Sequence, residues 1–255
     1  MVSDRPKIDG YAIADCVARF RAVRPHVHCI TNSVAQHFTA NVLLAAGATP
    51  SMTIAPEEVS DFVHMADALL INLGTMDDTR SLAVNRAVQA AQKGKKVWAL
   101  DPVFVQASPV RLELAQELLG KAPDLLRCNR GEYEALFHRK LDATGELHPP
   151  CGTTIALTGK TDLIGNGSGR VALHNGSALM DRVTTMGCAL TGLAIGFMAV
   201  EDEEILAVTS AMALYGLAGE QAELRSDGPG TFVPYFLDAL CNLSGDQLIE
   251  EVRLS

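Results

Sequence analysis

The stretch VWALDPVFVQASPVRLELAQELLGKAPDLLRCNRGEYEALFH, residues 97–138, decides the fold. Two short apolar runs within it, 97–100 and 124–128, are typical of buried strands. Each run is followed by a helical pattern, the first at 110–119 and the second at 132–138. Strands that alternate with helices in this way indicate βα crossovers and a mainly parallel sheet.

The same unit extends on both sides of this stretch. Upstream, each of two further strands precedes a helical pattern, and downstream three strands are followed by three helices. The expected strands are 27–31, 68–72, 153–157, 162–165 and 170–174, and the expected helices are 34–46, 81–92, 187–200, 203–223 and 231–243. Residues 140–152 are rich in Gly and Pro and are expected to form a loop. The pattern predicts one α/β domain over residues 1–255.

Composition excludes several classes of protein. Apolar residues make up 48% of the chain and aromatic residues 5%, so the core must consist mainly of aliphatic side chains. A formal charge of −9 opposes nucleic-acid binding, which depends on clustered Lys and Arg. No apolar run approaches the roughly 20 residues of a membrane span. Six scattered cysteines without paired spacing and an N-terminus without a signal-peptide pattern predict a cytoplasmic protein with free thiols.

Polar residues that follow the expected strands are the candidates for function. In open α/β sheets ligands bind at the carboxyl ends of the strands, where helix N-termini point inward. The polar segments at these ends are Asn32, Gly74-Thr75, Asp101-Pro102, residues 129–132, residues 158–160 and residues 184–188. We therefore expect a single polar site along this edge of the sheet.

Cys188 follows Gly187 at an expected helix start, where free backbone N–H groups favour an anion. These N–H groups can hold a transferring phosphoryl group. A thiol at this position is expected to have a lowered pKa and to accept a proton from a substrate hydroxyl. The alternative is that Cys188 is an ordinary buried residue of the helix.

Four residues near the ends of the next strands suggest a nucleotide site, and each has a structural alternative. Asn129 and Glu132 can hold the waters around magnesium, or they form a capping box at a helix start. Arg127 can neutralise phosphate charge, or it extends to solvent from the core edge. Asp101 can orient magnesium waters or cap a turn.

Three further residues are weaker candidates on their own. Thr158 offers a hydroxyl to a phosphate, although a simple turn explains it equally well. Asn32 can line a polar pocket with His28, and Met52 is by itself more typical of a core position.

Seven segments, taken in order, resemble the hydroxyethylthiazole kinase family over nearly the whole chain. They are VHCITN at 27–32, FTAN at 38–41, LINLGT at 70–75, LDPV at 100–103, ALTG at 156–159, GCAL at 187–190 and GPGTF at 228–232. The resemblance implies a ribokinase-like three-layer αβα sandwich with a mainly parallel central sheet. It also implies phosphorylation of the hydroxyethyl group of 5-(2-hydroxyethyl)-4-methylthiazole, with ATP and Mg²⁺, in thiamine salvage.

The resemblance assigns a role to each candidate. Cys188 would be the catalytic residue, and Asp101 and Glu132 would serve the metal. Arg127, Asn129 and Thr158 would bind ATP, whereas Met52, Asn32, Thr185 and Gly187 would bind the thiazole alcohol. The family also implies a homotrimer with active sites between subunits.

Three departures from the family pattern leave alternatives open. Thr185 stands where a glycine is usual, Phe104-Val105-Gln106 replaces a Gly-x-Gly segment, and a crossover helix is missing between Glu132 and Thr158. A side chain at position 185 is expected to crowd the phosphoryl group or to forbid a backbone angle. The missing helix is expected to leave one sheet face partly uncovered, unless oligomer contacts or a rearranged loop hide it. A binding or regulatory relative, or a kinase for another small alcohol such as a hydroxymethylpyrimidine, remains possible.

Overall fold

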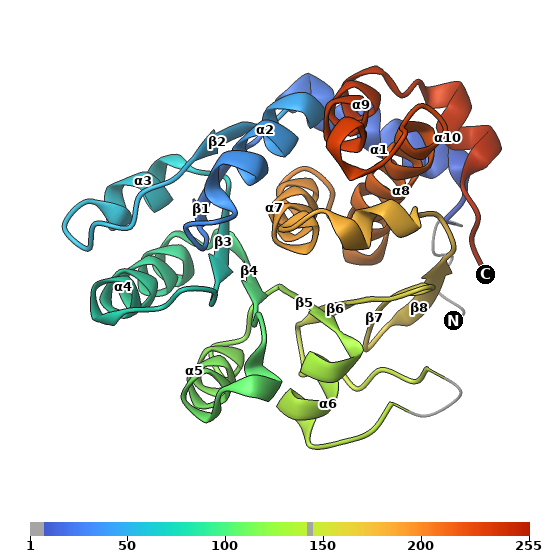
Figure 1. The fold of residues 1–255 in the computed structure, drawn as a ribbon. Coiled ribbons are helices and arrows are strands. Elements are labelled where there is room, and N and C mark those ends of the chain that lie inside the picture. The colour runs from blue at the N-terminus through green and yellow to red at the C-terminus, as the bar shows by residue number, and fades with distance from the viewer. Residues whose placement is uncertain (1–7, 142–144) are drawn as a thin grey trace.

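A computed structural model describes residues 8–141 and 145–255 of the chain (Figure 1). Within them the chain forms one sheet of eight strands in the order β2-β1-β3-β4-β5-β6-β7-β8. The strands are β1 (His26–Ile30), β2 (Thr49–Ser51), β3 (Ala68–Asn72), β4 (Val97–Asp101), β5 (Leu125–Asn129), β6 (Thr154–Thr158), β7 (Asp162–Asn166) and β8 (Gly169–Leu173). Strands β1 to β6 pair in parallel, and β7 and β8 continue the sheet as an antiparallel hairpin.

Helices cover both faces of this sheet, so the expected three-layer sandwich is confirmed. One layer contains α3 (Val59–Met65), α4 (Asp78–Gly94), α5 (Pro109–Leu119) and α6 (Arg130–Phe137). The other contains α1 (Gly10–Val23), α2 (Gln36–Ala46), α7 (Met186–Met198), α8 (Glu204–Glu223), α9 (Pro229–Asn242) and α10 (Gly245–Glu251). None of these helices is both long and apolar enough to span a membrane.

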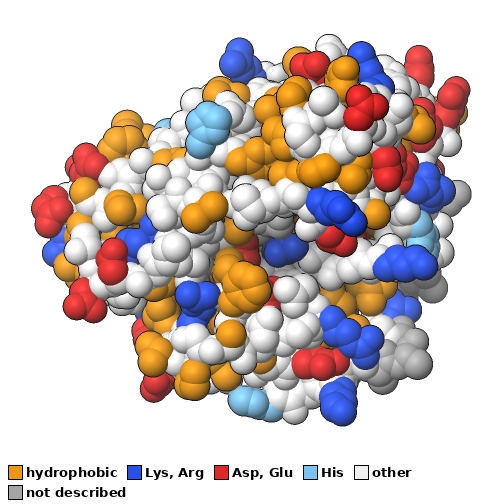
Figure 2. All heavy atoms as spheres, viewed as in Figure 1, with side chains coloured by type: hydrophobic (Ala, Val, Ile, Leu, Met, Phe, Trp, Pro, Cys, Tyr) orange, Lys and Arg blue, Asp and Glu red, His pale blue; other side chains and the backbone are white. Residues whose placement is uncertain are grey.

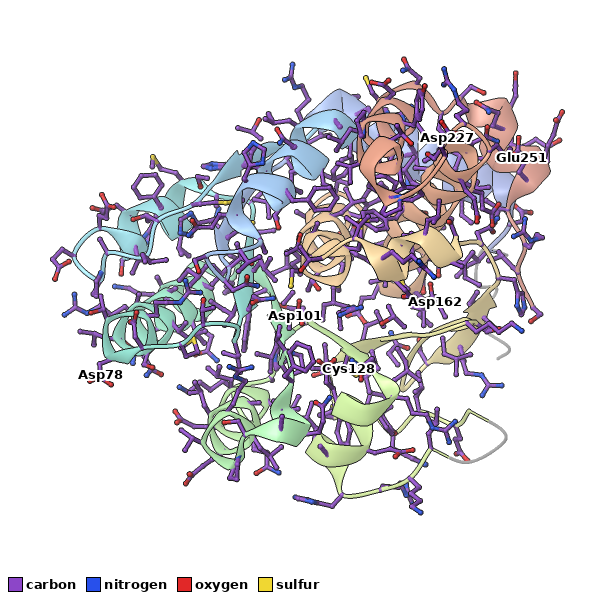
Figure 3. The ribbon with its side chains drawn as sticks, in the orientation of Figure 1. Asp78, Asp101, Cys128, Asp162, Asp227 and Glu251 are labelled. Carbon is purple, nitrogen blue, oxygen red and sulfur yellow. The ribbon has the colours of Figure 1, made fainter. Side chains whose placement is uncertain are left out.

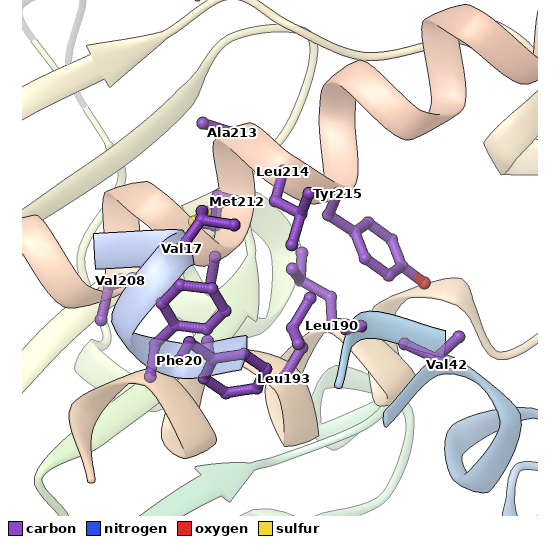
Figure 4. Packing of buried hydrophobic residues seen from close by; sticks show 14 of the residues in the cluster. Val17, Phe20, Val42, Leu190, Leu193, Val208, Met212, Ala213, Leu214 and Tyr215 are labelled. Carbon is purple, nitrogen blue, oxygen red and sulfur yellow. The ribbon is translucent and has the colours of Figure 1, made fainter. Parts of the chain in front are cut away.

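The strands are apolar on both sides because each residue must face one of the two helical layers. Along β3, for example, Leu70 packs in the cluster with α7 and α8, whereas Leu69 and Ile71 pack in the cluster with α4. This alternation is what parallel strands between two layers require. Figure 4 shows the first cluster, where Leu190 and Leu193 of α7 pack against residues of α8. Helix α7 is therefore packed between the sheet and α8.

Among the α-helices and strands of the described residues, α1, β2, α3 and α10 were missing from the sequence-based prediction, as were two short 3₁₀ helices at 105–107 and 178–182. Strand β2 has three residues and α3 has seven, too few for a period of two or of 3.6 to be evident. Helix α1 begins at Gly10 behind Asp9, whose side chain accepts hydrogen bonds from the N–H groups of Tyr11 and Ala12.

The described residues between α6 and β6, 138–141 and 145–153, contain no helix, yet they cover part of the sheet. Leu141 is 9% exposed and Leu147 packs against the same cluster as α6. Arg130 donates to the carbonyl of Leu141 at 2.6 Å, and the N–H of His148 donates to the Tyr133 hydroxyl. A rearranged loop therefore covers part of this face, and residues 142–144 lie outside the described part.

Candidate active site

Five polar side chains come together along the carboxyl edge of the sheet. Asn32 follows β1, while Asn72, Asp101, Asn129 and Thr158 are the last residues of β3, β4, β5 and β6. The parallel register pairs Asn72 with Asp101 and Asn129 with Thr158. The expected single polar edge is therefore observed.

A chain of hydrogen bonds joins three of these strand ends. Nδ2 of Asn32 donates to Oδ1 of Asn72 at 3.1 Å, and Nδ2 of Asn72 donates to Oδ2 of Asp101 at 2.8 Å. Backbone donors fix both amide orientations, because the N–H of Gly74 binds Oδ1 of Asn72 and the N–H groups of Val34 and Ala35 bind Oδ1 of Asn32. Asn72, which is fully buried, is the hub of this chain.

Asn72 was missed as a site residue in the sequence. It lies in the LINLGT segment, where no role was predicted for it. Its hydrogen bonds are to Asn32 and Asp101, which lie 40 and 29 residues away in the chain. The one available signal was its position at a strand end next to Gly74. Such a signal does not show which neighbours an amide will contact.

Cys188 is the third residue of α7 and lies at the end of the asparagine chain. Its Sγ accepts a hydrogen bond from Nδ2 of Asn32 at 3.4 Å. Burial, and to a lesser extent the nearby Asp101 carboxylate, raises the pKa of the Cys188 thiol to about 12. The predicted lowering of this pKa is wrong, because loss of solvent around the thiol outweighs the effect of the helix N-terminus.

Thr185 precedes α7 with φ 73° and ψ 1°, a left-handed conformation that is unfavourable for a β-branched residue. Phe104, the first residue of the other non-glycine segment, likewise has φ 57°. The expectation that a side chain would forbid this angle at position 185 is wrong. The chain adopts the angle and accepts local strain, which is of the order of 1 kcal/mol.

Arg127 connects the strand ends to α7. Its Nη2 donates to the Thr158 hydroxyl at 2.7 Å. A Cβ added at Gly187 would lie 2.5 Å from the same nitrogen, so only glycine allows the guanidinium to lie against the start of α7. Burial disfavours the charge, but Asp101 and Glu132 outweigh it and raise the pKa of Arg127. A fixed positive charge therefore stands next to the free N–H groups of the helix.

Asn129 and Glu132 form a capping box at the start of α6. Oδ1 of Asn129 accepts from the Glu132 N–H at 3.0 Å, and Oε2 of Glu132 accepts from the Asn129 N–H at 2.9 Å. Oε1 of Glu132 accepts from the N–H of Phe104 at 2.9 Å. The structural alternative is thus observed, and it holds the Glu132 carboxylate in place behind Asp101 and Arg127.

Asp101 has one satisfied and one unsatisfied oxygen. Oδ2 accepts from Asn72 and, at 3.1 Å, from the Thr191 hydroxyl, whereas Oδ1 is buried without a hydrogen-bond partner. Burial raises the pKa of Asp101 to about 6, despite the opposing charge of Arg127. Figure 3 labels Asp101 between α7 and the ends of the strands. An unpaired buried carboxylate oxygen is what a hard cation or its bound water would satisfy.

This pKa predicts how stability depends on pH. The pKa of Asp101 is about 6 in the folded protein and 3.8 in the unfolded chain. Between these two pH values the unfolded chain releases the proton while the folded protein still holds it. The free energy of unfolding therefore falls as pH rises through this window. Relative to Asp101→Asn, the wild type is expected to lose about 2.4 kcal/mol of unfolding free energy between about pH 4 and pH 8. Urea unfolding of both proteins across this range is the measurement. A difference that is independent of pH would contradict the raised pKa.

A cavity of about 920 Å³ opens beside Arg127 and Gly187. Figure 2 shows this face of the molecule hollowed near its centre, with charged side chains inside the hollow. Its lining includes the predicted residues Arg127, Asn129, Thr158 and Gly187. Residues that the sequence-based prediction did not assign also line it: Lys160, Asp162, His174, Asn175, Gly176, Ser177, Asp181, Met212 and Tyr215.

The candidate site residues thus fall into two adjoining groups. Asn32, Asp101 and Cys188 are joined by the asparagine chain, while Arg127 and Gly187 link this group to the cavity. Met52 belongs to neither group. It follows β2, is half-buried and packs against the hydrophobic layer that contains α7.

The chain is similar to known proteins over most of its length. The model of the hydroxyethylthiazole kinase family matches residues 17–246. A hydroxyethylthiazole kinase of Pectobacterium atrosepticum is 40% identical over 92% of this chain and 95% of its own length. A probable hydroxyethylthiazole kinase of Agrobacterium fabrum is 40% identical over 94% of both chains.

Solved structures agree with this similarity. Hydroxyethylthiazole kinase of Pyrococcus horikoshii superposes with a TM-score of 0.88 at 33% identity and covers 95% of this chain and 98% of that one. A ribokinase-like protein of Enterococcus faecalis superposes with a TM-score of 0.62 at 15% identity, covering 90% of this chain and 89% of that one. At that identity the second match concerns the fold alone, which is the expected ribokinase-like one.

Proposed function

Because the chain belongs to the hydroxyethylthiazole kinase family, we propose that it phosphorylates 5-(2-hydroxyethyl)-4-methylthiazole with ATP, in thiamine salvage. The alcohol oxygen forms a bond to the γ-phosphorus of ATP, and the bond from that phosphorus to the β,γ-bridging oxygen breaks. ADP leaves, and the hydroxyl proton is released as the new ester forms.

One observation carries this proposal: the Arg127 guanidinium lies against Gly187 at the N-terminus of α7. Phosphoryl transfer depends on positioning and on charge stabilisation around the moving group. A buried guanidinium and free helix N–H groups, which face the same place, supply both without reorganisation. The γ-phosphoryl group would therefore lie beside the Arg127 guanidinium, where it can also reach the free N–H groups at the start of α7.

The cavity on one side of this point is the proposed nucleotide site. Arg127, Asn129 and Thr158, the residues assigned to ATP from the sequence, all line it. A volume of about 920 Å³ accommodates a ligand larger than a small alcohol.

The asparagine chain on the other side is the proposed acceptor site. Asn32 and Cys188 lie next to Gly187, so a hydroxyl bound there would face the phosphoryl position. Thr185 begins the turn ahead of α7, and Met52 would contact the thiazole ring from the neighbouring strand end. Cys188 would contact the acceptor hydroxyl as a neutral thiol, because its pKa is about 12.

Magnesium would be held by Asp101, with Glu132 behind it. The residues fit this ion, since Asp101 has a buried carboxylate oxygen without a hydrogen-bond partner. Mg²⁺ typically keeps several waters and takes only one or two carboxylates together with substrate phosphates. When bound, it would neutralise charge on the phosphates.

We also propose that residues 1–255 act as one kinase domain, in the cytoplasm and as a homotrimer with sites between subunits. Val34 and Leu44, near the two ends of α2, are 61% and 56% exposed, which suits contact with another subunit. Light scattering behind gel filtration measures the assembly, and a monomer at all concentrations would contradict it.

The reaction is tested by ADP release coupled to a spectroscopic readout. The thiazole alcohol is expected to be the best acceptor in a panel that includes a hydroxymethylpyrimidine and a sugar. Calorimetry with the thiazole alcohol and with Mg-ATP follows binding separately. Binding of both ligands without ADP release would instead support a binding or regulatory relative.

Replacing Cys188 with alanine is expected to lower kcat about 10- to 100-fold, less than the removal of a preformed base. The thiol is protonated at neutral pH and would contribute by positioning the acceptor hydroxyl, while Asn32 donates a hydrogen bond to its sulfur. Steady-state kinetics at pH 8 are the measurement, with the exposed Cys241→Ala as control. Equal turnover in wild type and Cys188→Ala would remove Cys188 from the mechanism. A kcat that rises tenfold per pH unit from 7 to 10 would instead assign it as a thiolate base.

A further inference from the structure

One wall of the cavity is a segment without regular secondary structure of its own. His174, Asn175, Gly176 and Ser177 line the cavity between the end of β8 and the next helical turn. A loop has few internal hydrogen bonds, so its shape depends on the groups that bind it from outside. The partners of this wall therefore decide the shape of the cavity.

The Glu220 carboxylate of α8 is the first of these partners. It accepts a hydrogen bond from the backbone N–H of Gly176 at 2.8 Å and another from the Asn175 amide at 3.2 Å. The backbone of Asn175 also packs directly on α8, where a Cβ at Gly216 would lie 2.7 Å from the Asn175 carbonyl oxygen. The wall at 174–177 therefore packs against the buried helix α8.

Residues 253–255 are the second partner. They run antiparallel to the end of β8, with two hydrogen bonds between Ala172 and Ser255 and one from the His174 N–H to the Arg253 carbonyl. The backbone N–H of Arg253 donates to Oδ1 of Asn175 at 2.8 Å. Its guanidinium donates to the His174 carbonyl at 2.9 Å and to both oxygens of Glu220.

Asn175 shows how completely the wall is held. It is 6% exposed, and its side chain accepts from Arg253 and donates to Glu220 and to the Glu251 carbonyl at 3.1 Å. The His174 ring also forms hydrogen bonds at both of its nitrogens. Nε2 lies 2.9 Å from the Ser255 hydroxyl, and Nδ1 lies 3.3 Å from the Thr161 hydroxyl.

We propose that Glu220 and Arg253 are positioning residues for nucleotide binding, which clamp the wall at 174–176 in the shape that fits the nucleotide. The proposal rests on the proposed function, because it takes the cavity as the nucleotide site. Neither residue lines the cavity, so their effect on the nucleotide is indirect. Neither belongs to the acceptor site around Cys188, so the acceptor should be unaffected.

The experiment compares Glu220→Ala and Arg253→Ala with a matched control, Arg19→Ala. Arg19 pairs with Glu201, and the side chains of that pair are 48% and 14% exposed, against 53% and 21% for Arg253 and Glu220. Neither Arg19 nor Glu201 lines the cavity. The control therefore removes a similar ion pair without touching the wall.

Glu220→Ala is expected to raise KM for ATP about tenfold and Arg253→Ala about threefold, with kcat and KM for the thiazole alcohol within about twofold of wild type. Arg19→Ala should leave all three constants within about twofold. Hydrogen exchange of the peptide that covers 172–178 should quicken in the first two variants alone.

Two outcomes would overturn the clamp: an unchanged KM for ATP in Glu220→Ala, or equal rises in KM for both substrates. A rise in KM for ATP in Arg19→Ala would show a general loss of stability and would also overturn it. A wild-type protein that shows no saturation with ATP would contradict the proposed function, and the clamp would fall with it. Kinetics of the wild type therefore distinguish a failure of the proposed function from a failure of the clamp alone.

Discussion

Arg127→Lys is expected to lower kcat/KM at least about 100-fold, the largest loss for any conservative change in the site. The lysine keeps a positive charge next to Asp101, so the buried carboxylate retains a partner and the fold is preserved. An ammonium group, however, cannot hold the Thr158 hydroxyl and also present a planar edge to a phosphoryl group at the start of α7. Steady-state kinetics with varied ATP are the measurement.

Arg86→Lys is the matched control for this change. Arg86 is exposed, but like Arg127 it donates a hydrogen bond through its guanidinium, to the Pro56 carbonyl at 2.7 Å, and it does not line the cavity. It should keep activity within about twofold of wild type. Thermal unfolding of both variants separates a loss of fold from a loss of chemistry. Comparable activity of Arg127→Lys and wild type would contradict the role of the guanidinium.

Gly187→Ala is expected to lower kcat about 100-fold while the protein stays folded. Alanine is a good helix residue, so the second position of α7 tolerates it, yet its Cβ would lie 2.5 Å from the Arg127 guanidinium. The guanidinium must then move away from the helix N-terminus. A displacement of about 1 Å is enough for a loss of this size.

Gly230→Ala tests whether this effect depends on the contact. Gly230 is likewise the second residue of a helix, α9, but nothing lies within 4 Å of its added Cβ. It should retain wild-type kcat, and its melting temperature should equal or exceed that of the wild type. Equal activity of Gly187→Ala and Gly230→Ala would show that Arg127 does not need to lie against α7.

Much of this architecture could be predicted because its causes are local. The apolar runs at β3, β4 and β5 and the helical patterns after them follow from neighbouring residues, and parallel strands then bring Asn72, Asp101 and Asn129 to one edge. The capping box of Asn129 and Glu132 also follows from a spacing of three residues. It was one of two alternatives in the sequence, and only coordinates could choose between them.

Other features could not be predicted because they depend on burial and on distant partners. The pKa of Cys188 was expected to fall, since a helix start can be read from the sequence while the loss of solvent around the thiol cannot. The hub role of Asn72 depends on residues of β1 and β4, and the clamp on the 174–176 wall depends on residues more than 40 positions away.

The sequence by itself therefore determined most of the strands and helices, although not α1, β2, α3 and α10, together with the edge of the sheet that carries the site and the family through its motifs. The tertiary structure alone decided how the charged groups behave: Arg127 seated against Gly187, Asp101 left with one unpaired oxygen, and a thiol that keeps its proton. The physical reason is the distance along the chain over which each effect acts. Backbone preference and periodicity act over a few residues, whereas solvation and hydrogen bonding depend on which distant segments the folded chain brings together.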